Sequence, residues 1–143
     1  MKGDPTPNKI HPQNIIDAQF SAYYQTANSL NHGSATGMKT YAAARLTDPA
    51  VHALSELILV EPVEGMVGFA ADLEIIWQDG KVERTVQALP LGEVGHPFTK
   101  EKVDEKFRSL AEPVLGAKRA GEVIKVVDDL EQKSVEELLV LLR

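Results

Sequence analysis

The first strong pattern in the chain is a helical spacing of apolar residues between positions 14 and 31. The spacing alternates between four and three residues, which is typical of one face of a helix. This face comprises Ile16, Phe20, Tyr23, Ala27 and Leu30. Asn14 can cap the start of such a helix, and Gly33 can end it in the left-handed conformation. Before it, three prolines predict an extended lead-in over residues 1–13, and residues 33–37 are expected to form a loop.

An alternation of apolar and polar residues predicts a β-hairpin over residues 67–88. The odd positions are apolar up to Trp77, and alternation resumes at Val82. Asp79-Gly80 between the two runs is typical of a two-residue turn. The register that follows pairs Trp77 with Val82, Leu73 with Val86 and, as the one mismatch, Ile75 with Arg84.

The remaining patterns predict helices and one further strand. Residues 38–45 can form one or two helical turns, and Thr47 precedes Asp48-Pro49 as the expected cap of the next helix. The β-branched apolar run at residues 57–60 predicts a buried strand. Three helices are predicted in the C-terminal part. The first is capped by Thr99 and has an apolar stripe of Val103, Phe107, Leu110 and Val114. The second covers residues 120–132, and the third covers residues 135–142, with Ser134 and Glu137 as a capping box.

These elements predict an α+β fold over residues 14–143. We expect a two-layer sandwich in which helices cover a small, mostly antiparallel sheet that contains the hairpin. The length of 143 residues is that of one domain.

Charge and composition narrow the classes of function. The formal net charge of −6 argues against nucleic acid or an anionic membrane as the main partner, because both require clustered Lys and Arg. With no cysteine in the chain, disulfides, thiol catalysis and thiolate metal sites are excluded. No apolar run approaches the length of a membrane helix and no signal segment is visible, so we expect a cytoplasmic protein.

A polar stripe lies beside the apolar face of the first predicted helix. It comprises Asp17, Ser21, Tyr24, Asn28 and Asn31. A tyrosine on such a stripe can donate a proton or hold a carboxylate, and it can equally shield a helix edge. Of the four histidines, none lies at the helical spacing of a metal-binding pair. His96, in the loop Gly95-His96-Pro97, is the one best placed to face a ligand, the alternative being an ordinary surface histidine.

The residues around this stripe resemble the opening of the C-terminal domain of the MmgE/PrpD family. This family includes 2-methylcitrate dehydratase, cis-aconitate decarboxylase and iminodisuccinate epimerase. The resemblance runs from His11-Pro12 through Ala18, Ser21 and Tyr24 to Gly33, and it extends over about residues 8–143. Further landmarks in the same order are Asp48-Pro49, the Asp79-Gly80 hairpin, Gly95-His96-Pro97, Lys106-Phe107 and residues 127–131.

The resemblance implies a lyase or isomerase that acts on a small di- or tricarboxylic acid, by elimination, decarboxylation or epimerisation next to a carboxylate. It implies that Tyr24 occupies the position of an active-site tyrosine, and that Ser21 and His96 are weaker candidates for substrate binding. It also implies a metal-independent and cofactor-free reaction at a cleft completed by a helical N-terminal domain that is absent from this chain. The isolated chain is therefore expected to be inactive.

Two other functions stay open from the sequence. The chain can be a stand-alone module in which the face that meets a helical domain forms a homodimer or another protein contact. It can also be a non-catalytic module that binds a small carboxylate through Tyr24.

Overall fold

The computed structural model describes residues 6–33 and 38–143. The chain divides into two units, residues 1–62 with 104–143 and residues 63–103, and each is described by itself. Within the described residues the secondary structure consists of helices and one two-stranded antiparallel sheet, which confirms the α+β class. The covering of the sheet by helices stays a prediction.

The N-terminal segment begins with three helices rather than a lead-in and one long helix. A single turn, α1 (Pro7–Ile10), lies within the predicted lead-in. The predicted helix over residues 14–31 is divided into α2 (Ile15–Gln19) and α3 (Ala22–His32). Asn14 caps α2 as predicted, and Ser21 caps α3 by accepting the Tyr24 backbone N–H at 3.0 Å. This second cap explains the division, because an N-cap residue has extended rather than helical backbone angles.

Three short helical elements follow. They are the 3₁₀ turn η1 (Met38–Tyr41), α4 (Ala43–Leu46) and α5 (Pro49–Ser55). The cap of α5 is Asp48, whose carboxylate accepts the Ala50 N–H at 2.9 Å, and not Thr47 as predicted. Gly33 ends α3 with a φ of 75°, as expected; the rest of the expected loop, residues 34–37, lies outside the described residues.

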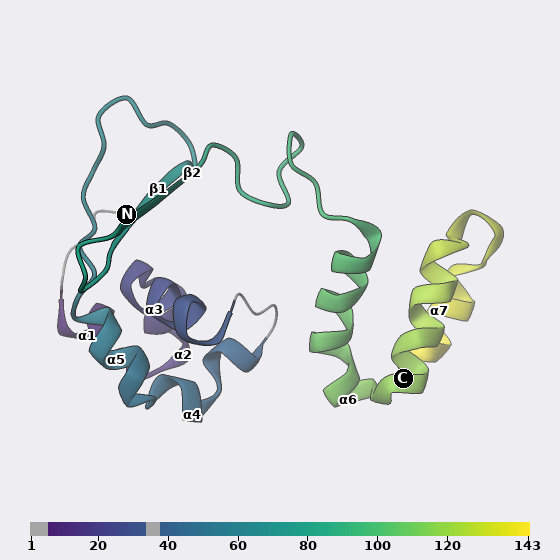
Figure 1. Ribbon diagram of the computed structural model, residues 1–143. Helices are drawn as coiled ribbons and strands as arrows, with labels where there is room; N and C mark the ends of the chain where they lie inside the picture. Colours follow the sequence, from purple (N-terminus) through teal and green to yellow (C-terminus); the bar gives the residue numbers. More distant parts are fainter. Residues whose placement is uncertain (1–5, 34–37) are drawn as a thin grey trace. The chain divides into compact units, whose positions relative to one another are not determined.

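The core of these helices lies between α3 and α5, which run side by side (Figure 1). Its fully buried apolar residues are Ala18, Tyr24, Ala27 and Val51, and Tyr41, Leu46, Leu54 and Ile58 pack around them. The predicted apolar face is only partly buried. Tyr23 and Ala27 lie inside, but Ile16, Phe20 and Leu30 are exposed. Because the chain breaks at Ser21, α2 and α3 do not continue one helical stripe.

The predicted strand at residues 57–60 is wrong. The chain leaves α5 through a turn in which the Ile58 N–H bonds to the Ser55 carbonyl, and no strand forms there. Leu57 and Leu59 are 78% and 86% exposed, and Ile58 alone of the three packs on the core. An apolar run of four residues without a neighbouring strand lacks the hydrogen-bonding partners that a strand requires.

The predicted hairpin is present, but its register differs by one residue. Strands β1 (Ala71–Ile76) and β2 (Val82–Gln87) pair antiparallel, with Ile76 opposite Val82 and Glu74 opposite Arg84. The Trp77 N–H donates to the Lys81 carbonyl at 2.8 Å, so the loop has three residues rather than two. Gly80 is its last residue, with a φ of 85° that glycine adopts without strain.

This register removes the mismatch that the two-residue turn would create. Arg84 donates from Nε to Asp72 Oδ1 at 2.8 Å, and this contact lowers the pKa of the Asp72 carboxyl. In exchange, each face of the hairpin mixes apolar and charged side chains. The observed pairing satisfies the arginine at the expense of a fully apolar face.

The C-terminal helices agree with the prediction. The helix α6 (Lys100–Asp128) is broken at Gly116, which has a φ of 76°, into two helical segments. A short turn, η2 (Leu130–Gln132), leads to α7 (Val135–Leu141), whose capping box of Ser134 and Glu137 is confirmed. The predicted apolar stripe of the first segment is largely exposed, and the buried residues of α6 are Ala120 and Val123 in the second segment.

We expect Val51→Ala to lower the free energy of unfolding by about 2 kcal/mol, because Val51 is fully buried against α3 and its loss leaves a cavity. Urea denaturation measures this change. Val63→Ala is the matched control, since Val63 is 53% exposed and its replacement should change stability by less than about 0.5 kcal/mol. Equal losses in the two variants would contradict the placement of the core between α3 and α5.

Candidate functional site

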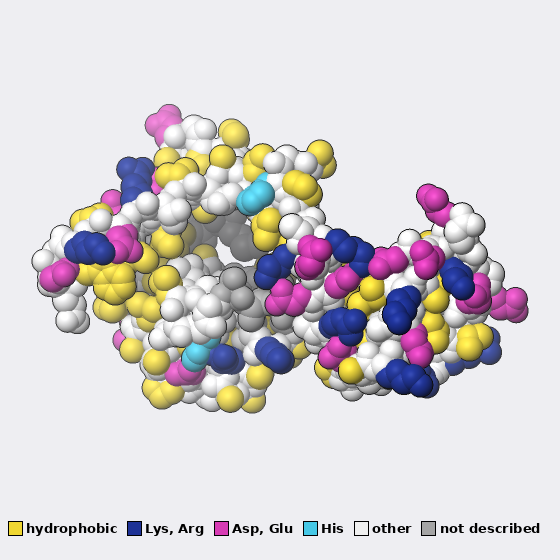
Figure 2. Space-filling view, turned by 45° about the vertical axis from the view of Figure 1, so that its right-hand side comes forward, with side chains coloured by type: hydrophobic (Ala, Val, Ile, Leu, Met, Phe, Trp, Pro, Cys, Tyr) yellow, Lys and Arg dark blue, Asp and Glu magenta, His cyan; other side chains and the backbone are white. Residues whose placement is uncertain are grey.

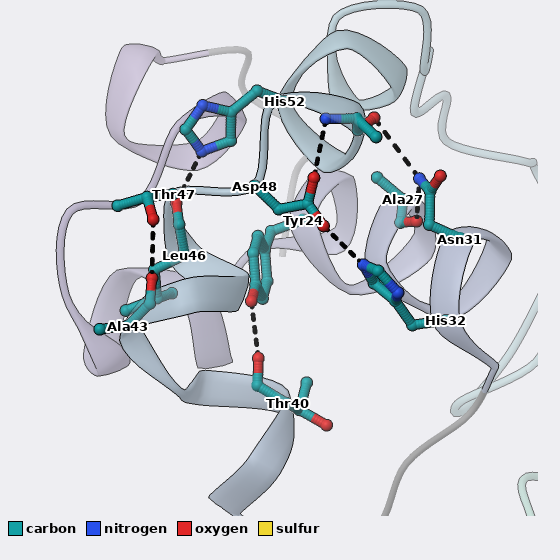
Figure 3. A network of polar contacts seen from close by, with 11 residues as sticks. Tyr24, Ala27, Asn31, His32, Thr40, Ala43, Leu46, Thr47, Asp48 and His52 are labelled. Atoms are coloured by element: carbon teal, nitrogen blue, oxygen red, sulfur yellow. Dashed lines mark hydrogen bonds and ion pairs between the residues drawn. The ribbon is translucent and has the colours of Figure 1, made fainter.

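Tyr24 lies in the interior of the N-terminal helices. Its side chain is 0% exposed, and its hydroxyl donates to the Thr40 backbone carbonyl at 2.6 Å (Figure 3). This bond joins the first turn of α3 to η1. The prediction that the phenol borders an open cleft is wrong in this structure, because the hydroxyl is enclosed and its hydrogen is used by a backbone oxygen.

The middle of the polar stripe of the first predicted helix therefore faces the interior, whereas Asp17 is only partly buried and Asn31 is exposed. Ser21, Tyr24 and Asn28 are all buried, at 1%, 0% and 2% exposure. A stripe of this composition can face the interior because each polar group can bond to backbone. The exception is Asn28 Oδ1, which has no donor within the described part of the chain.

Ser21, the first predicted substrate-binding residue, has a structural task in this chain. Its hydroxyl oxygen accepts the Tyr24 N–H, and the hydroxyl donates to the Lys9 carbonyl. Both bonds hold backbone, one at the start of α3 and one in α1. A substrate-binding role for Ser21 stays a prediction.

His96, the other predicted substrate-binding residue, belongs to the unit of residues 63–103. It is exposed, and its Nδ1 lies 3.2 Å from the Leu89 carbonyl oxygen. The Gly92 N–H donates to the His96 carbonyl at 2.8 Å, so the loop is closed by its own backbone. The structure brings Ser21 and Tyr24 together, and the proximity of His96 to them stays a prediction.

A histidine–carboxylate pair that the sequence did not indicate lies at the far end of α3. His32 Nε2 donates to Asp48 Oδ2 at 2.7 Å, while Asp48 Oδ1 caps α5 (Figure 3). A carboxylate bound to one ring nitrogen fixes the orientation of an imidazole, as in catalytic dyads. Each residue stands at a helix end that the sequence marks: His32 comes just before Gly33, and Asp48 comes just before Pro49. The sequence does not indicate that these two helix ends meet in space.

The two remaining histidines also meet, on the other side of α5. The His11 and His52 rings contact each other edge to face at 4.6 Å between centroids. His11 Nε2 donates to Glu56 Oε1 at 3.0 Å, and His52 Nε2 donates to the Leu46 carbonyl at 2.7 Å. These contacts tie the segment before α2 to α5 and its C-cap Glu56, and they tie α5 to the end of α4. Their spacing of 41 residues hides the pairing from any sequence motif.

The guanidinium of Arg45 acts electrostatically on Tyr24. Burial raises the pKa of the Tyr24 phenol, and the guanidinium of Arg45 opposes this by lowering it. Arg45 is partly buried, and its Nη1 is a buried nitrogen for which the described residues provide no acceptor. A carboxylate is the acceptor that a guanidinium binds most strongly.

The chemistry of this region is that of hydrogen-bond donors and one oriented imidazole. The buried phenol stays neutral at physiological pH, since its pKa lies above the ordinary value of 10.0, and it can donate but not act as a base. Within the described part of the chain, no three His, Asp or Glu side chains are arranged to hold a metal ion. No helix in that part has both the length and the apolar character needed to cross a bilayer.

Comparison with protein families identifies the domain. Residues 3–132 match the family described as MmgE/PrpD C-terminal domain, which covers most of the chain and confirms the resemblance found in the sequence. The chain therefore belongs to the MmgE/PrpD family, as a C-terminal domain. A comparison with curated proteins found no match.

We expect Tyr24→Phe to lower the free energy of unfolding by about 1 kcal/mol at neutral pH, because the buried hydrogen bond from the phenol to the Thr40 carbonyl is lost. The difference between the wild type and Tyr24→Phe should shrink as the pH rises above about 10. There the unfolded tyrosine loses its proton while the buried one, with its raised pKa, keeps it, so the wild type loses stability. Urea denaturation between pH 7 and 11 measures both effects.

Tyr41→Phe is the comparison variant. The Tyr41 hydroxyl accepts a hydrogen bond from the Gln25 side-chain amide, whereas the Tyr24 hydroxyl donates one to a buried backbone carbonyl. If the difference between the wild type and Tyr24→Phe stays constant across this pH range, the phenol is not buried as described.

Proposed function

We propose that this chain is the C-terminal domain of a lyase or isomerase that acts on a small di- or tricarboxylic acid, in the manner of 2-methylcitrate dehydratase. The observation that carries this proposal is the family match over residues 3–132. The reaction begins when a base removes the proton next to a carboxylate. In a dehydration, the electron pair then forms a carbon–carbon double bond, and an acid protonates the departing hydroxide to give water.

The described residues can supply hydrogen-bond donors and a positive charge to the reaction, and we propose that they do not supply the base that removes the proton. A neutral buried phenol and a guanidinium do not remove a proton from carbon at neutral pH. His32 is bound through its Nε2 to Asp48 Oδ2 at 2.7 Å, so this imidazole is already engaged within the domain. We therefore propose that the main base belongs to a helical partner domain and that the isolated chain has no turnover.

In this proposal Tyr24 acts as a positioning residue. Its bond to Thr40 fixes η1 relative to α3, and Arg45 lies in α4, the next helix along the chain. A site that uses the Arg45 guanidinium depends on this arrangement. The role of an acid that touches substrate, which the family position of Tyr24 implies, would require the Thr40 bond to open.

The activity of the isolated chain tests the division of labour between domains. We expect no dehydration of 2-methylcitrate, no decarboxylation of cis-aconitate and no epimerisation of iminodisuccinate by the chain alone. We expect turnover of one of these acids when a helical N-terminal polypeptide of the same family is added, with that polypeptide alone as the inactive control. Turnover by this chain without a partner would refute the proposal that the base lies elsewhere.

Carboxylate binding by Arg45 is a separate test that needs no turnover. In an NMR titration of the labelled chain, we expect citrate to shift the amide signals of η1 and α4. Arg45→Met should weaken this binding at least fivefold, because the variant keeps the apolar stem of the side chain and loses the guanidinium. Lys118→Met is the matched control, since Lys118 is an exposed cation of α6. Equal affinity for citrate in the wild type and Arg45→Met would exclude Arg45 from a carboxylate site.

A further inference from the structure

The C-terminal helices form an open groove between the second segment of α6 and α7. Its volume is about 650 Å³. Apolar and charged side chains from both helices line it, and we call the apolar ones its floor and the charged ones its rim. The floor includes Val126, Val140 and Leu141, and the rim includes Glu122, Asp129 and Glu136.

The floor of this groove is exposed although it is apolar. Val140 is 62% exposed, and Val126 and Leu141 are only partly buried. Small-molecule pockets enclose most of their ligand, and a floor this open does not. Two helices with an apolar trough between them are instead typical of surfaces that receive a third helix.

The charge on the rim indicates the chemistry of that third helix. Lys133 is already paired with Glu137, at 3.2 Å, and Glu137 also accepts the Ser134 N–H of the capping box. Lys125 is the other ammonium on the rim. Within the described residues no cation pairs with Glu122, Asp129 or Glu136, so three carboxylates remain against one ammonium.

The negative rim also decides between two occupants. A second copy of this chain would bring an equally acidic rim against this one, and like charges at a contact oppose association. A helix with lysine or arginine beside its apolar face would pair with each of the three carboxylates. Figure 2 shows apolar side chains between acidic and basic ones on one face of the C-terminal helices.

We propose that the groove between α6 and α7 binds an amphipathic helix with a basic flank, supplied by another protein or another domain. One wall of the groove is α7, which lies beyond residue 132, where the family match ends. The other wall, the second segment of α6, lies within the matched residues. The groove does not depend on the function proposed above, because none of its residues lies in the Tyr24 network.

Two peptides that differ in charge alone test this proposal on the full chain. The first is a short helical peptide with leucines along one face and lysines on both flanks, and the second has glutamate in place of lysine. We expect fluorescence anisotropy to show binding of the basic peptide, weakened by added salt, and at least tenfold weaker binding of the acidic one. Equal binding of both peptides would overturn the proposal.

Variants of the groove separate apolar contact from general charge attraction. Val140→Asp adds a negative charge, and charge attraction alone would make the basic peptide bind more tightly. We expect at least tenfold weaker binding instead, because the substitution places a charge on the apolar floor. The double variant Glu122→Lys with Glu136→Lys should weaken binding at least tenfold. The matched control, Glu131→Lys with Glu64→Lys, makes the same charge change at exposed positions outside the groove and should change affinity less than threefold. An unchanged affinity in Val140→Asp, or an equal loss in the control, would overturn the proposal.

Circular dichroism of each variant confirms that the helices persist. Sedimentation velocity of the wild type and Val140→Asp tests the other occupant. A wild-type dimer that Val140→Asp converts to monomer would show that a second copy fills the groove, and would likewise overturn the proposal.

Discussion

The arrangement of the N-terminal helices depends on one buried hydrogen bond, from the Tyr24 hydroxyl to the Thr40 carbonyl. A phenol can enter an apolar core only if its hydroxyl finds an acceptor, since an unpaired buried hydroxyl is costly. The Thr40 carbonyl belongs to η1, so the same bond that makes the burial possible also fixes η1 beside α3. Arg45, Asp48 and the start of α5 follow within a few residues, and their positions follow from this contact.

That constraint changes how the family resemblance should be understood. The sequence resemblance implies that Tyr24 stands at the position of an active-site tyrosine, and this stays a prediction; in this structure its hydroxyl donates to the Thr40 carbonyl. The groups left for chemistry are those that the buried tyrosine places around itself: the His32–Asp48 pair and the guanidinium of Arg45. Because the His32 imidazole is already paired with Asp48, the arrangement is consistent with a function that needs a second domain.

Local signals in the sequence were sufficient for most elements of the fold. The caps at Asn14 and Ser134, the stop at Gly33 and the hairpin with Gly80 in its turn are all as predicted, because each depends on residues only a few positions apart. The division at Ser21 was missed because an unbroken apolar spacing hid a second cap. The hairpin register was missed because Asp79-Gly80 fits loops of two or three residues, and the choice depended on the ion pair between Asp72 and Arg84 across the strands.

The candidate site was less accessible from the sequence than the fold. Its contacts join residues 16 to 45 positions apart, such as His32 with Asp48 and His11 with Glu56, and helical spacing carries no information on such pairs. The amphipathic pattern was also misleading for Tyr24. Polar neighbours on a helix suggested a solvent face, whereas Ser21 and Asn28 are buried with it because backbone groups meet part of their hydrogen-bonding needs.

The hairpin of β1 and β2 has one more consequence. Within the described residues each strand has a single neighbour, so the outer backbone of both strands is free to extend a sheet with a strand from another polypeptide. The charged side chains on each face, Arg84 and Glu74 among them, act against such extension between identical copies. Among the described residues, these two strand edges are therefore the places where pairing with a strand of another chain can start.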